Sequence, residues 1–70
     1  MDITVVNQLR RKYTALADHL DEKARRLWAG VEARELGHGG VTMVAEATGL
    51  SPDAIRRGVR EVETGSAPEG

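Results

Sequence analysis

The spacing of apolar residues in the first third of the chain restricts its fold more than any other feature. From Val6 onward they recur at intervals of three and four, at Val6, Leu9, Tyr13, Leu16 and Leu20. This spacing produces one stripe along an α-helix. Asp2 stands just before the pattern as an N-cap candidate, so we expect a helix from Ile3 to Asp18.

A second helix is predicted to start near Asp21. Asp21 and Glu22 place negative charge at its N-terminus, where the helix dipole favours it. Its apolar face is expected to contain Ala24, Leu27, Trp28, Val31 and Leu36. The segment GHGG, residues 37–40, should end this helix, because a glycine inside a helix costs about 1 kcal/mol relative to alanine. We expect the first two helices to form an antiparallel hairpin in which Trp28 is mostly buried.

The stretch VTMVAEATGLSPDAIRRGVREV, residues 41–62, predicts two short helices joined by a tight turn. Gly49 suits a left-handed C-cap, and Ser51 suits an N-cap followed by Pro52 at the first helical position. Leu50 and Ile55 should point into the core. So short a connection forces a steep crossing, which is the helix-turn-helix arrangement. We therefore predict an all-α, four-helix domain over residues 1–62, with a flexible acidic tail over residues 63–70.

The outward positions of the last predicted helix suggest a function. In a helix-turn-helix the second helix enters the major groove of DNA, and the fork of an arginine reads guanine or clamps phosphate. We predict that the principal DNA contacts are Arg56, Arg57 and Arg60. Supporting contacts are expected from Thr42, Ser51 and Asp53. Gly58 either permits a close approach to a neighbouring helix or to DNA, or is a tolerated surface glycine.

Composition excludes several classes of protein. Seventy residues suit one small domain, and the absence of cysteine excludes disulfides and cysteine-based zinc sites. No apolar run approaches the roughly 20 residues of a membrane helix and no signal peptide is evident, so we expect a cytoplasmic protein. The cluster DHLDE, residues 18–22, is better interpreted as helix capping than as a metal site. We expect no metal, no other cofactor and no catalytic residue.

Three features in order suggest a family: LDEKxRRLWAxxEAxxLGxGG, then a helix ending in ATGLS, then IRRGxRE. From about Leu16 to Val62 the chain resembles the N-terminal region of the Rhodopirellula-type DDE transposases of bacterial insertion sequences. The resemblance implies a module that binds terminal inverted repeats and precedes a catalytic domain with an RNase H-like fold. No Asp or Glu here matches the catalytic carboxylates. We therefore expect an isolated N-terminal domain or a truncated relative that does not cut DNA.

Two other functions fit the same pattern. A free-standing helix-turn-helix transcription regulator would use the same arginines and would need to form a homodimer on DNA, because one short helix reads few base pairs. A helical protein-interaction module would instead present the arginines to an acidic partner. The net charge of −1 does not favour DNA, although residues 1–60 alone are slightly basic.

Overall fold

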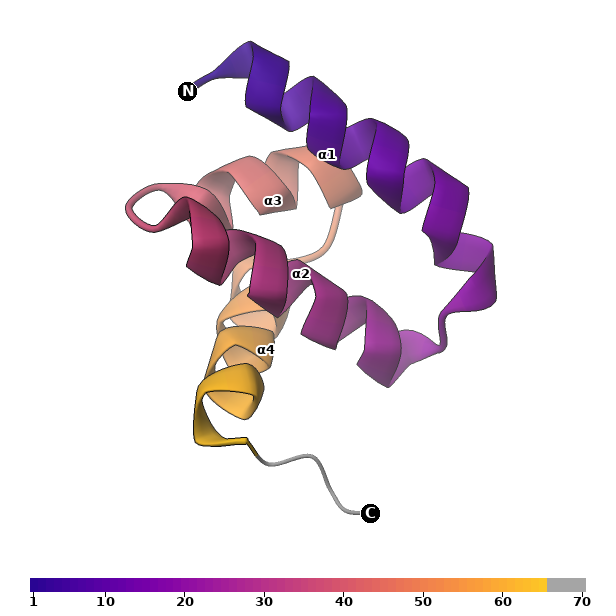
Figure 1. Cartoon of the computed structure of the whole chain (residues 1–70), viewed down its shortest axis with the longest axis vertical. Coiled ribbons are helices and arrows are strands. Elements are labelled where there is room, and N and C mark those ends of the chain that lie inside the picture. The colour runs from indigo at the N-terminus through magenta and orange to yellow at the C-terminus, as the bar shows by residue number, and fades with distance from the viewer. Residues whose placement is uncertain (66–70) are drawn as a thin grey trace.

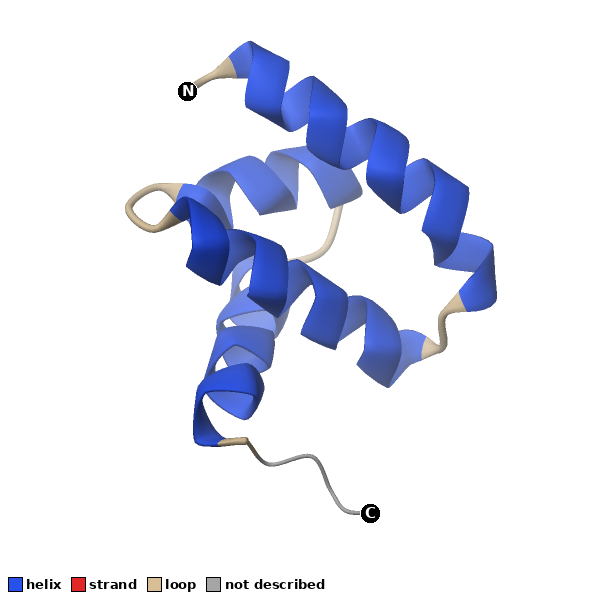
Figure 2. Ribbon diagram, viewed as in Figure 1, coloured by secondary structure: helices blue, strands red, loops and turns tan. Residues whose placement is uncertain are grey.

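The computed structural model describes residues 1–65, which form helices and no strand (Figures 1 and 2). The elements are α1 (Ile3–Leu16), the short 3-10 helix η1 (Ala17–His19), α2 (Glu22–Leu36), α3 (Gly40–Thr48) and α4 (Pro52–Thr64). The predicted all-α class with four helices is confirmed. Among the helices of residues 1–65, none combines the length and the apolar character required to cross a bilayer.

Side-chain caps fix the starts of the first two helices as predicted. The Asp2 carboxylate accepts a hydrogen bond from the backbone N–H of Thr4 at 3.0 Å, and the Asp21 carboxylate accepts one from Ala24 at 2.8 Å. Each bond satisfies an N–H group that has no partner inside its helix. The second cap accounts for one carboxylate of the DHLDE cluster, and the described residues contain no group of side chains suited to a metal ion.

The first helix ends two residues earlier than expected. α1 stops at Leu16, and the chain tightens into η1. The Arg25 guanidinium donates two hydrogen bonds to the carbonyl oxygen of Ala17, at 3.0 and 2.7 Å, and the backbone N–H of Leu20 donates to the same oxygen. Because Arg25 belongs to the first turns of α2, its hydrogen bonds fix the end of α1 against α2, and the chain turns at this point.

The fourth helix runs two residues further than expected, through Thr64. The Thr64 hydroxyl donates to the carbonyl oxygen of Glu61, and Gly65 caps the helix in a left-handed conformation with φ +64°. Glu63 and Thr64, which we had placed in the tail, are therefore helical. The rest of the predicted tail, residues 66–70, lies outside the described residues.

The expected hairpin of the first two helices is looser than a packed pair. α1 and α2 run in opposite directions with a gap between their ribbons, and α3 lies behind and between them (Figure 1). The main contact of α1 is with α3. Long side chains connect α1 with α2: the Tyr13 and Trp28 rings lie 5.6 Å apart, and Lys12 forms an ion pair with Glu32 at 3.3 Å.

The core consists mainly of small aliphatic side chains. Its buried members are Val6, Leu9, Ala29, Ala33, Val44, Ala47 and Ile55. The prediction for α2 was only partly right about its buried face. Ala29, Gly30 and Ala33 are buried, whereas Val31 is 43% exposed. Trp28 packs against the core with most of its surface buried, as predicted. α3 and α4 pack closely on α2, and this closeness requires the face with the smallest side chains.

The contact between α2 and α4 is the most extensive between any two elements of the described chain. At its centre Gly30 faces Gly58. A Cβ on Gly58 would collide with the carbonyl oxygen of Arg26, and a Cβ on Gly30 would lie 2.6 Å from the carbonyl oxygen of Gly58. Of the two interpretations of Gly58, close approach to a neighbouring helix is therefore correct, and the backbones of the two helices touch directly.

An ion pair borders this crossing. The Arg26 guanidinium donates to both carboxylate oxygens of Glu61, at 2.9 and 3.2 Å. These hydrogen bonds hold the pKa of Glu61 below its ordinary value and raise the pKa of Arg26. A second, more exposed pair joins Arg34 to Glu63 at 3.5 Å. Both pairs connect α2 to the C-terminal half of α4.

Candidate nucleic-acid interface

A three-residue turn, Gly49 to Ser51, separates α3 from α4, as predicted. Gly49 adopts the left-handed conformation with φ +79°, and its backbone N–H donates to the carbonyl oxygen of Ala45. The Thr48 hydroxyl donates to the carbonyl oxygen of Val44 at 2.8 Å and accepts from the backbone N–H of Leu50 at 3.1 Å. Thr48 therefore bridges the end of α3 and the turn, a role that the sequence did not suggest to us.

Ser51 starts α4 in the expected way. Its hydroxyl oxygen accepts a hydrogen bond from the backbone N–H of Ala54 at 3.1 Å, and Pro52 occupies the first helical position. Because the oxygen is the acceptor in this bond, the hydroxyl hydrogen stays available to a ligand. Leu50 packs against the core and Ile55 is fully buried, which confirms both predictions.

The arginines of α4 share its exposed face. Ile55 and Gly58 are buried on the opposite side, whereas Arg56, Arg57 and Arg60 are exposed. With about 100° of rotation per residue, Arg60 lies between Arg56 and Arg57 around the helix axis. The close contact of Gly58 with α2 thus directs all three guanidinium groups outward.

Each arginine of this face has a different electrostatic setting. Arg56 forms an ion pair with Asp53 one turn earlier, at 3.1 Å, and both side chains are well exposed. Arg57 lies near Glu61 and contributes to the lowering of its pKa. Arg60 makes no hydrogen bond or ion pair with any residue between 1 and 65. Asp53 is therefore the partner of Arg56, and its own side chain is 97% exposed.

Thr42 is not part of the α4 face. It is the third residue of α3, exposed near the opposite end from the turn. About 9 Å along the helix axis separates it from Thr48. It borders a shallow depression with Met1, Asp2, His38, Gly39 and Met43. Five of the six predicted site residues are thus together on α4 or at its cap, and Thr42 is apart. His38 is exposed in its loop.

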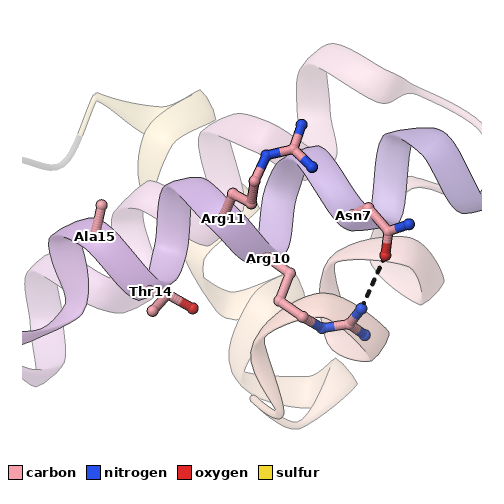
Figure 3. Close-up of a pocket in the computed structure, with 5 residues that line it drawn as sticks. All are labelled: Asn7, Arg10, Arg11, Thr14 and Ala15. Atoms are coloured by element: carbon pink, nitrogen blue, oxygen red, sulfur yellow. Dashed lines mark hydrogen bonds between the residues drawn. The ribbon is translucent and has the colours of Figure 1, made fainter.

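Sequence reasoning missed the residues that orient the site. Gly30 and Arg26 fix α4 against α2, and a glycine inside each of two predicted helices was the signal for this contact. It also missed a second basic surface on α1, where Arg10 and Arg11 border a shallow depression (Figure 3).

Comparison of the chain with protein-family models, with curated proteins and with solved structures yields no match.

Proposed function

We propose that this chain binds double-stranded DNA through α4 as the second helix of a helix-turn-helix. Its role would be sequence-specific recognition of terminal inverted repeats, as the N-terminal module of an insertion-sequence transposase. In this proposal the chain recognises DNA without cutting it, needs no cofactor and acts inside the cell. The sequence resemblance described above supplies the transposase context.

The observation that carries the proposal is the exposed row of Arg56, Arg57 and Arg60 on a helix that begins directly after a three-residue turn. A guanidinium can donate two parallel hydrogen bonds to guanine O6 and N7, or to a phosphate. α4 has 13 residues, so it extends about 20 Å, long enough for its first two turns to lie in a major groove.

The roles of the individual residues follow from their positions. Arg56 lies in the second turn of α4, where recognition helices meet base edges, and Asp53 holds its guanidinium in one direction. Arg60 lies one turn further along and suits the sugar-phosphate backbone. The Ser51 hydroxyl has a proton to donate to a phosphate at the start of the helix, and Arg57 suits either role.

The test begins with selection of a binding site from a pool of random duplexes. Fluorescence anisotropy then measures the affinity of each variant for the selected duplex and for a scrambled one at several salt concentrations. Arg56→Ala should cost about 1–3 kcal/mol on the selected site and relax the preference at one base pair. Arg60→Ala should weaken binding to both duplexes equally and lower the salt slope by about one unit.

Lys12→Ala is the charge-matched control, because it removes one positive charge from α1 and leaves α4 unchanged. Its effect on both duplexes should be small. If Arg56→Ala binds the selected and the scrambled duplex as tightly as the wild-type chain does, α4 is not the reading helix. If no duplex is enriched and none binds even at low salt, DNA binding itself is wrong.

One observation favours a protein-interaction module as a second candidate, although one that binds through apolar residues of α2 and not through the arginines of α4. On α2 the side chain of Val31 is 43% exposed, and Leu27 is only partly buried and lies outside the core cluster. An apolar partner surface would cover them. Val31→Ser would then weaken capture of a protein partner without changing DNA affinity, whereas DNA binding through α4 predicts no such partner.

A further inference from the structure

We infer, on the basis of the proposed function, that α1 carries a second DNA-binding surface that holds the sugar-phosphate backbone. This surface, the α1 basic face, consists of Asn7, Arg10, Arg11 and Thr14 around a shallow depression with Ala15 at its edge (Figure 3). It would fix the position of the domain on the duplex while α4 reads bases.

The two arginines of the α1 basic face extend to either side of the helix (Figure 3). Arg10 is positioned by two contacts: its guanidinium donates to the Asn7 side chain at 3.1 Å and to the carbonyl oxygen of Glu46 at 3.3 Å. Arg11 makes no hydrogen bond or ion pair within residues 1–65. A strand that ran along α1 between them would therefore have a guanidinium on each side.

The location of the α1 basic face is compatible with one duplex that contacts both α1 and α4. Glu46 is the seventh of nine residues in α3, so Arg10 contacts the end of α3 from which the chain turns into α4. The α1 basic face thus lies beside the end of α3 that leads into the turn and α4. The major groove of B-DNA is about 12 Å wide and is bordered on both sides by sugar-phosphate backbone, so a backbone lies beside any helix that enters the groove.

The charge and residue types of the face suit phosphate. No carboxylate lines the depression, and the contact of Arg10 with Glu46 is to the backbone carbonyl oxygen and not to the carboxylate. Arginine, asparagine and threonine donors are the side chains that typically bind backbone phosphates. Asn7 to Thr14 covers about 10 Å of helix, which is long enough to contact more than one phosphate of a strand.

The next residue along the chain supplies a control. Lys12 follows Arg11 but points to α2, where its ammonium group forms an ion pair with Glu32. Lys12→Ala and Arg11→Ala change the net charge of the chain by the same amount. If Arg11 contacts a phosphate, Arg11→Ala weakens DNA binding more than Lys12→Ala does. If only the net charge matters, the two variants weaken DNA binding equally.

The experiment measures binding of the full chain to a labelled duplex of about 20 random base pairs, by anisotropy over a salt series. Each arginine that neutralises one phosphate contributes about 0.9 to the salt slope, which is about fivefold in affinity near 0.15 M salt. We expect Arg11→Ala to lower the slope by about one unit, Arg10→Ala/Arg11→Ala by about two, and Lys12→Ala by much less. Thermal unfolding by circular dichroism checks that each variant remains folded.

The same variants are then compared on the duplex selected for the wild-type chain. Equal losses on selected and random duplexes support a backbone contact. A slope that stays unchanged in Arg11→Ala and in the double variant, while Arg56→Ala still loses affinity for the selected duplex, overturns the α1 surface and leaves the proposed function intact. An equal slope change in Lys12→Ala also overturns it. Absence of wild-type binding to every duplex refutes the proposed function itself.

Discussion

Gly58→Ala tests whether backbone contact holds α4 in place. A Cβ at this position would collide with the carbonyl oxygen of Arg26, and at the facing Gly30 the corresponding distance is 2.6 Å. Carbon–oxygen contacts ordinarily measure about 3.3–3.6 Å, so α2 and α4 must separate by about 1 Å. Overpacking of this kind costs up to about 3 kcal/mol, and the gain in helix propensity from glycine to alanine returns about 1 kcal/mol.

The free energy of unfolding should therefore fall by about 2 kcal/mol, which lowers Tm by roughly 8–16 °C in a domain of this size. Urea unfolding followed by far-UV circular dichroism measures the change. The variants Arg57→Ala and Arg57→Gly give the control, because this neighbouring position is exposed and alanine should be favoured there by about 1 kcal/mol. A Gly58→Ala chain at least as stable as the wild-type chain would show that the helices are not in backbone contact.

Two further changes test the ends and the border of α4. Because the hydrogen bonds from Arg26 lower the pKa of Glu61, the pair stabilises the fold above the ordinary glutamate pKa near 4.5, and this stabilisation is lost as the pH falls through the lowered value. Urea unfolding across acidic pH should therefore show a fall in stability that Glu61→Gln reduces; identical pH profiles would contradict this. Ser51→Ala removes the N-cap of α4 and should cost about 1 kcal/mol in the same assay, whereas Ser51→Asp should keep most of that stability.

Local signals were sufficient to predict the elements of the fold. A cap is decided by one side chain and the backbone next to it, so Asp2, Asp21, Gly49 and Ser51 could each be assigned without knowledge of the tertiary structure. The exposure of Arg56, Arg57 and Arg60 followed in the same way from the period of one helix. The end of α1 was missed because the carbonyl of Ala17 is held by Arg25, a residue of the next helix.

The packing between helices was harder to predict. The apolar period of α2 indicated the side with Leu27 and Val31, because large side chains dominate any hydrophobic pattern. Its buried side instead contains Ala29, Gly30 and Ala33, whose small size allows α3 and α4 to pack close to the backbone of α2. Thr42 was predicted as a DNA contact because its hydroxyl can bind phosphate. Most of the length of α3 separates it from the arginines of α4. Position along a neighbouring helix cannot be derived from the pattern of one helix.

The direct backbone contact at Gly30 and Gly58 has a consequence for recognition. Side chains that interlock between helices can change rotamer and allow a helix to roll, but two backbones in contact leave no such adjustment. The orientation of α4 is thus set before any ligand arrives, and a partner of the arginine face would have to order only side chains. The entropic cost of association then depends on the exposed guanidinium arms and not on the helix that bears them.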